Sequence, residues 1–256
     1  MIKFFRRIRQ KMLTENKFSK YLFYAVGEII LVVIGILIAL SVNNWNQENK
    51  DRRLGNDYLL RIHHDLVQDT TAFRNIITQN NALREDIKKA LVTLYNGVDD
   101  IEQVKYISEV YDKALDQVFT PNDNTYRGMV SSGTLGLIYN LELKESIIDL
   151  YSDYDQKGAL LLAIGNWMIS MATAESTQTD LIKFGSGVID IFTTSEMLNE
   201  YDYAFLNNKE DPNFKMLVRA ISATAFNQKA SNGIYMELIS KCDKVLQRID
   251  QELKIN

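Results

Sequence analysis

The chain has 256 residues, 46% of them hydrophobic and 24% charged, which is the composition of a globular protein apart from one long apolar stretch. Only two prolines and twelve glycines interrupt it, which disfavours an all-β fold, and its single cysteine excludes an internal disulfide. The net charge of −4 becomes −9 when residues 1–42 are left out, with 22 basic against 31 acidic residues, so nucleic acid is a poor candidate partner for residues 43–256.

The first twenty residues are strongly basic. Glu15 is their one acidic residue, against Lys3, Arg6, Arg7, Arg9, Lys11, Lys17 and Lys20. Because positive residues stay on the cytoplasmic side of a membrane, this segment predicts a cytoplasmic amino terminus. Two interpretations stay open. The segment is either a plain basic anchor or a short helix that lies on anionic headgroups, with Phe5, Ile8 and Met12 on one side.

The stretch from Tyr21 to Val42 is apolar except for Glu28 and Ser41, and its length suits a helix that spans a bilayer. Tyr21 and Trp45 lie about 36 Å apart along a helix at ~1.5 Å per residue, so their rings fit the two membrane interfaces. A cleaved signal peptide is the alternative, because residues 39–41 resemble a cleavage site. The long basic lead and the length of the apolar stretch favour a retained anchor.

Four residues of this stretch predict contact with another helix. Glu28 lies about 10 Å past Tyr21 at ~1.5 Å per residue, where a carboxylate must be neutral, paired or facing protein. Gly35 and Ala39 form a small pair that permits close backbone approach, and Gly27 lies two turns earlier on a neighbouring face. The alternative is a monomeric anchor in which Glu28 is protonated.

Beyond Trp45 the pattern stays helical. Mostly apolar residues lie at a spacing of seven up to the stop signal Asn96-Gly97 and form a seam along one side of the helix. They are Leu59, Leu66, Phe73, Asn80, Ile87 and Leu94. Asp69 and Asn80 interrupt the apolar seam with polar groups. We therefore expect the seam to pack inside a helical bundle rather than to form a free coiled coil.

Further helices are expected along the rest of the chain. The capping and spacing signals place them at about 99–118, 125–138 with a bend near Gly133, 140–184, 193–206 and 212–253, with a short strand or apolar flap at 188–192. Residues 159–174 are apolar but number only about sixteen, so they predict a buried helix rather than a second span. The expected fold is all-α, with one amino-terminal transmembrane helix followed by an extracytoplasmic antiparallel helical bundle.

No constellation of residues predicts catalysis, a cofactor or a metal. His63 and His64 point about 100° apart on a helix, and no other histidine is present to complete a site. An acidic stripe, Glu142, Glu145, Asp149 and Asp153, suits a cation but more often marks a solvated face. Cys242 lies on the apolar side of the last helix, where a thiol acts as a small hydrophobe. We therefore expect the protein not to be an enzyme.

Two parts of the chain resemble a family of bacterial membrane proteins catalogued only as a domain of unknown function. The opening part comprises residues 1–9 (MIKFFRRIR), 16–21 (NKFSKY), 27–40 (GEIILVVIGILIAL) and 43–46 (NNWN), and the central part comprises residues 131–135, 137–138 and 141–151. The resemblance implies a single-pass inner-membrane protein with a periplasmic carboxy-terminal domain. It brings no activity, ligand or catalytic residue.

Together these patterns predict a cytoplasmic segment at 1–20, a transmembrane helix at 21–42 and a periplasmic helical bundle at 43–256. The expected function is that of an interaction or scaffold component, which associates through its spanning helix with a second copy or with another membrane protein in the lipid bilayer. The alternative is a ligand-sensing bundle. With only about twenty cytoplasmic residues it would need a separate partner to carry its signal.

Overall fold

The computed structural model of the chain describes residues 18–113, 120–172, 180–185, 187–192, 198 and 203–254. Within these ranges the secondary structure consists of helices joined by loops and turns, without a strand, which confirms the all-α prediction. The chain divides into two units, residues 1–57 and residues 58–256.

The described part of the first unit is helical throughout. It belongs to helix α2, Phe18–Asn96, which begins before the predicted span and continues past it. Within the described residues, α2 is the one helix long and apolar enough to cross a membrane. Its apolar side chains from Leu22 to Val42 are almost all exposed, so the chain itself does not cover them.

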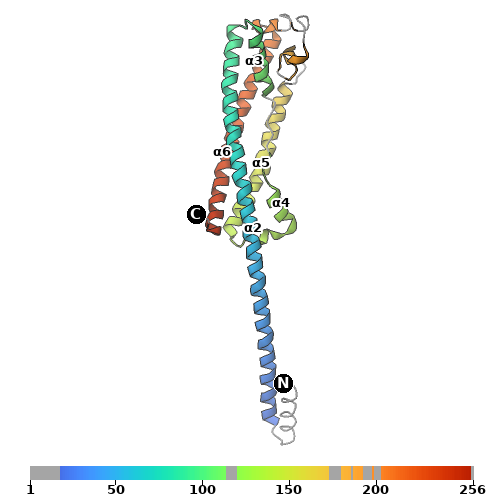
Figure 1. Cartoon of the computed structure of the whole chain (residues 1–256), viewed down its shortest axis with the longest axis vertical. Coiled ribbons are helices and arrows are strands. Elements are labelled where there is room, and N and C mark those ends of the chain that lie inside the picture. The colour runs from blue at the N-terminus through green and yellow to red at the C-terminus, as the bar shows by residue number, and fades with distance from the viewer. Residues whose placement is uncertain are drawn as a thin grey trace. The chain divides into compact units, whose positions relative to one another are not determined.

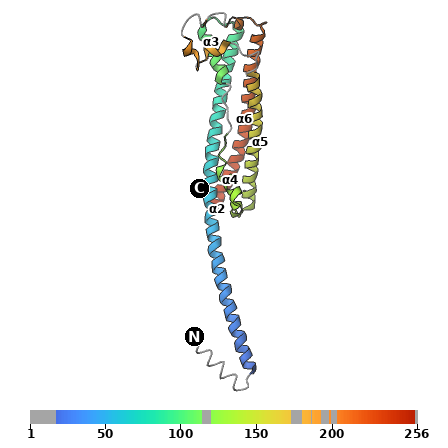
Figure 2. The same ribbon diagram turned by 90° about the vertical axis from the view of Figure 1, so that its right-hand side faces the viewer.

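The second unit is built on three long helices: the remainder of α2, α5 (Leu141–Ala172) and α6 (Pro212–Leu253). Figures 1 and 2 show α5 and α6 side by side, with α6 running opposite to both α2 and α5. The side-chain pairs agree, because Arg74 meets Asp243, whereas Asn80, further along α2, meets Asn232, which lies earlier in α6. The predicted antiparallel packing therefore holds for α6, whereas α2 and α5 run in the same direction.

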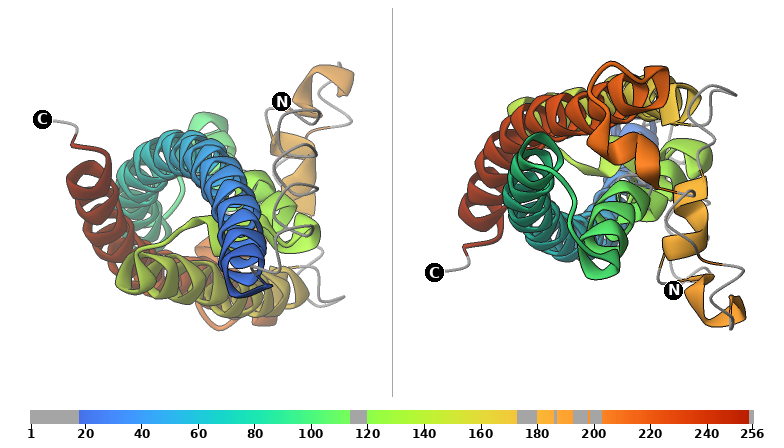
Figure 3. Two further views of the ribbon diagram at one scale, coloured as in Figure 1. Left: turned by 90° about the horizontal axis from the view of Figure 1, so that it is seen from below. Right: turned by 90° about the horizontal axis from the view of Figure 1, so that it is seen from above.

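The predicted heptad seam of α2 faces the core. All six of its members, from Leu59 to Leu94, are buried, including the polar Asn80. Seen end on in Figure 3, α2, α5 and α6 surround this core. Its apolar residues form two clusters, one around Leu66, Ile147 and Leu238 and the other around Ile87, Ile107 and Leu217.

Asparagine side chains lie between these two clusters and join α2 to α6. The Asn80 amide donates to Asn232 at 2.7 Å, and the Asn232 amide donates to Asn81 at 3.0 Å. A buried amide that loses its partner costs about 1–3 kcal/mol, so these bonds oppose sliding of one helix along the other. Asn80, which interrupts the apolar seam in the sequence, thus helps to fix the position of α2 relative to α6.

Sequence signals at the helix ends are confirmed in three places. Asp100 caps α3 (Ile101–Asp112) by accepting from the Gln103 backbone at 2.8 Å, and Asp211 caps α6 in the same way. The predicted bend at Gly133 is present, since helix α4 (Asn124–Ser132) ends there and the 3-10 helix η2 (Thr134–Leu137) follows. Gly133 has φ +71°, a conformation that glycine adopts without strain.

The predicted helix at 140–184 is wrong at its carboxy-terminal end, where residues 180–184 are not α-helical. Helix α5 ends at Ala172, and a separate 3-10 helix, η4, covers Asp180–Phe184. Residues 173–179, between these two helices, lie outside the described residues. The end of α5 is also less buried than predicted, because Leu162 and Trp167 are exposed.

The expected strand or flap near residues 188–192 is instead a 3-10 helix, η5 (Ile189–Ile191). The start of the predicted 193–206 helix, where the spacing of Thr193 and Glu196 suits a capping box, and the end of the 99–118 helix beyond Lys113 lie outside the described residues. A last 3-10 helix, η7 (Ala204–Asn207), precedes α6. Its Asn207 accepts from the backbone of Val98 and donates back to it, which ties the start of α6 to the end of α2.

Two leucines of α5 test the packing. Leu143 is 1% exposed within the core, whereas Leu162 is 65% exposed. Leu143→Ala should lower the free energy of unfolding by about 2–5 kcal/mol, because it leaves a cavity, and Leu162→Ala should change it by less than about 0.5 kcal/mol. Urea denaturation of the full chain in detergent, followed by circular dichroism, measures both. Equal losses would contradict the described burial.

Candidate functional site

A buried carboxylate lies at the centre of the second unit. Asp69 of α2 is 1% exposed, and it occupies a position where the seam would otherwise be apolar. Its Oδ1 accepts from the Asn122 backbone at 2.9 Å and from the Asn122 side chain at 2.7 Å, and its Oδ2 accepts from the Tyr154 hydroxyl at 2.8 Å. These donors supply the bonds that a buried carboxylate needs.

Tyr154 extends this network from α5 to α6. Its hydroxyl oxygen lies 3.1 Å from Sγ of Cys242, so the phenol donates to Asp69 and is placed to accept from the thiol. Cys242 is fully buried, as the sequence predicts. One carboxylate therefore links α2, the segment before α4, α5 and α6.

Burial sets the protonation of these groups. It raises the pKa of Asp69, an effect that the donors from Asn122 and Tyr154 oppose. Burial also raises the pKa of Tyr154, and it raises that of the Cys242 thiol to about 12. A thiol with so high a pKa stays protonated near neutral pH and is a poor nucleophile.

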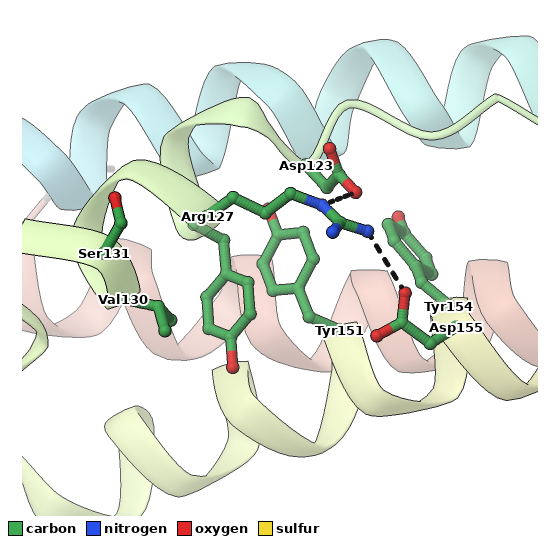
Figure 4. A pocket seen from close by; sticks show the side chains of 8 residues that line it. Asp123, Arg127, Val130, Ser131, Tyr151, Tyr154 and Asp155 are labelled. Atoms are coloured by element: carbon green, nitrogen blue, oxygen red, sulfur yellow. Dashed lines mark hydrogen bonds and ion pairs between the residues drawn. The ribbon is translucent and has the colours of Figure 1, made fainter.

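A cavity of about 300 Å³ adjoins this network between α4 and α5. Tyr126 and Tyr151 stack in its wall with ring centroids 4.2 Å apart and planes 4° apart, and Tyr154 meets Tyr151 edge to face. Asp123, Arg127 and Asp155 line it as well, as Figure 4 shows. We call this cavity the tyrosine pocket.

The guanidinium of Arg127 bridges two carboxylates at the pocket. Its Nε donates to Asp123 one turn earlier in sequence, and its Nη2 donates to Asp155 of α5 at 3.3 Å. Figure 4 shows the guanidinium between these two aspartates. The Arg127 side chain is 64% exposed, so solvent screens both ion pairs and they add little stability.

Tyr151 stands out because its hydroxyl is buried yet, within the described residues, has no hydrogen-bond partner. Figure 4 shows its ring pointing from α5 toward α4. Its pKa is raised, first by burial and then by the nearby charges of Asp65 and Asp69, so the phenol keeps its proton. Such a hydroxyl can both donate and accept.

The residues predicted for contact within the membrane lie in the part of α2 whose side chains are exposed on all sides. Gly27, Glu28, Gly35 and Ala39 are all exposed, and an added Cβ at either glycine would meet nothing within 4 Å. Trp45 is exposed too. The basic residues Lys3, Arg6, Arg7, Arg9 and Lys11, and the side chain of Tyr21, lie outside the described residues.

The two histidines do not share a site. His63 lies 3.1 Å from Asp250 and His64 lies 3.0 Å from Gln68, so they face different neighbours. Asp153 of the acidic stripe pairs with Lys241. Among the described residues, no group of three or more histidine, cysteine, aspartate and glutamate side chains is placed to hold a metal ion.

The tyrosine pocket was not predicted from the sequence. Tyr151, Tyr154 and Asp155 share one face of α5 at helical spacing, but their partners Asp123, Tyr126 and Arg127 come from a segment some thirty residues earlier. The one available signal was Asp69, whose polar group interrupts an apolar seam. A buried carboxylate requires partners, yet the seam does not say which residues supply them.

The comparisons with known proteins support one family. A family model described as a family of unknown function (DUF6090) matches residues 28–209, which covers the apolar stretch after Gly27, the tyrosine pocket and α5. No curated protein and no solved structure matches the chain.

Tyr154 and Tyr151 form a matched pair for testing the network, one turn apart on α5. Tyr154→Phe should lower the free energy of unfolding by about 1–3 kcal/mol, because Asp69 loses a donor. Tyr151→Phe should change it by less than about 0.5 kcal/mol, because its hydroxyl gives up no bond within the described residues. Chemical denaturation of both variants measures the difference. A larger loss for Tyr151→Phe would contradict the described network.

Proposed function

Since the chain belongs to the family of unknown function DUF6090 and membership supplies no activity, we propose that it is a membrane-anchored interaction component. The observation that carries the proposal is the apolar stretch from Leu22 to Val42, whose side chains are exposed throughout most of its length. Exposing so large an apolar surface to water is unfavourable, whereas lipid covers it at no such cost.

We further propose that the amino terminus lies in the bacterial cytoplasm and that the helical bundle lies in the periplasm. The basic segment 1–20 supports this orientation through the positive-inside rule. Action by binding, rather than by catalysis, is supported by the protonated Cys242 thiol and by the separate settings of His63 and His64.

Cysteine labelling tests the orientation, because burial protects the native Cys242 from reagent. Asp149 is exposed on α5, so Asp149→Cys should react in intact cells with a maleimide that does not cross the inner membrane. Lys11→Cys should react only after lysis. The opposite pattern would reverse the orientation, and an intact mass lacking residues 1–41 would show cleavage of the anchor.

Association through the spanning helix is the second part of the proposal. Gly35 and Ala39 offer a face where another helix backbone can approach closely. That helix can belong to a second copy of the chain or to another membrane protein.

Substitutions in this face test association in membranes. Gly35→Leu and Glu28→Leu should each weaken self-association or partner capture by about tenfold, since interhelical polar and packing contacts contribute about 1–2 kcal/mol. Val33→Leu is the control, because position 33 lies about 200° around the helix from Gly35 at ~100° per residue. Quantitative crosslinking of the full chain in native membranes provides the readout. Unchanged crosslinking in both test variants would contradict association through this helix.

A second candidate function, ligand sensing, is favoured by the tyrosine pocket. Its volume of about 300 Å³ is at the lower end of the range for small-molecule sites. The same helix, α2, contains both the buried Asp69 and the apolar stretch. A ligand that binds one conformation of the bundle more tightly would shift the bundle toward that conformation, and association through the same helix would change with it.

A further inference from the structure

The tyrosine pocket carries more negative than positive charge. Among the described residues that line it, Asp123 and Asp155 are acidic and Arg127 is the one basic residue. Asp65 lies close enough to raise the pKa of Tyr151, and it accepts from the Thr125 hydroxyl at 2.5 Å. An anionic ligand would therefore meet carboxylates on either side of Arg127, whereas a cation would meet carboxylates alone once that side chain withdraws.

Aromatic rings complete the pocket in a way that also suits a cation. Tyr126 and Tyr151 stack on each other in the pocket wall, which leaves the outer, electron-rich face of each ring, and Tyr126 is only partly buried. An ammonium group is attracted to such faces, and the attraction grows when water is excluded. Val130 supplies an apolar wall for the remainder of a ligand.

Arg127 occupies the place that this ligand cation would take. Its guanidinium already bridges Asp123 and Asp155, so the chain itself shows that the two carboxylates accept one cation between them. Because the arginine is largely exposed, its removal into solvent costs little. The pocket therefore has an internal cation that a ligand can displace.

The Tyr151 hydroxyl is the second, independent indication of a ligand. It is buried in the pocket wall, and it has no hydrogen-bond partner within the described residues. Figure 4 shows the Arg127 side chain crossing the hydroxyl end of the Tyr151 ring in this view. A ligand amine in place of the arginine can donate to that oxygen and satisfy it.

We infer that the tyrosine pocket binds a small organic ammonium ion, which displaces the guanidinium of Arg127 from between Asp123 and Asp155. This inference rests on the second candidate function, ligand sensing, and names the class of its ligand. A metal ion is a poorer fit, because the described residues provide no group of three protein ligands there.

Three probes with the same phenylethyl group and different charge test the class. They are 2-phenylethylamine, the neutral 2-phenylethanol and the anionic 3-phenylpropanoate, each titrated calorimetrically into the full chain in detergent, with detergent alone as the blank. The amine should bind at least about tenfold more tightly than the other two, which is the discrimination expected from one charge-specific contact. Tighter binding of the anion, or no binding of the amine at millimolar concentration, would overturn the inference.

Four variants locate the binding. Asp155→Asn and Tyr151→Phe should each weaken amine binding several-fold, and Asp149→Asn, an exposed change on the same helix, should leave it unaltered. Arg127→Ala should tighten amine binding, because the competing cation is gone. Weaker amine binding in Arg127→Ala, or equal effects of Asp155→Asn and Asp149→Asn, would place the amine elsewhere and overturn the inference.

The same samples separate this inference from sensing itself. If the amine binds in the pocket but leaves crosslinking between full chains and their partners unchanged, the ligand class stands and sensing fails. If none of the probes binds while association through Gly35 persists, the ligand class fails and the anchored interaction function stands.

Discussion

The bundle depends on the burial of one carboxylate. Removing Asp69 from water is costly unless donors replace the water, and its three donors come from Asn122 and Tyr154. Those residues belong to two different parts of the chain, and Tyr154 in turn touches Cys242 of α6. A shift of α5 by one turn would separate Tyr154 from Asp69 and leave the carboxylate short of a donor. The network therefore selects one relative position of the helices, where apolar contacts alone would tolerate several.

This constraint also shapes the tyrosine pocket. Asn122 is held against α2, which fixes the start of the segment that carries Asp123, Tyr126 and Arg127. On the other side, Tyr154 fixes the face of α5 that presents Tyr151 and Asp155. The pocket thus lies between two elements that a single buried group positions. The Arg127 side chain that forms its ion pairs is 64% exposed, so these pairs contribute little to the position of the two elements.

The sequence predicted the features that follow from a regular residue spacing, and it did not predict the contacts between residues that are distant in the chain. The seven-residue spacing from Leu59 to Leu94 identified the buried face of α2, because helical periodicity is local. The predicted helix at 140–184 was wrong at residues 180–184, which form a 3-10 helix, since an apolar pattern alone does not reveal where an α-helix stops. The pocket could not be predicted, because Tyr126 and Tyr151 stack only through the tertiary fold. The sequence showed Asp69 as a polar exception in the apolar seam, but only the structure identified its hydrogen-bond partners.

The backbone amide of Asn122 gives the most direct test that Asp69 organises the bundle. Asn122 lies in a loop before α4, where an amide would ordinarily exchange its hydrogen quickly with water. Hydrogen exchange of the full chain in detergent, compared with that of Asp69→Ala, measures its protection. The account predicts an Asn122 amide as protected as those of the core helices, with the protection lost in the variant. Rapid exchange in the unaltered chain, or equal protection in both, would contradict it.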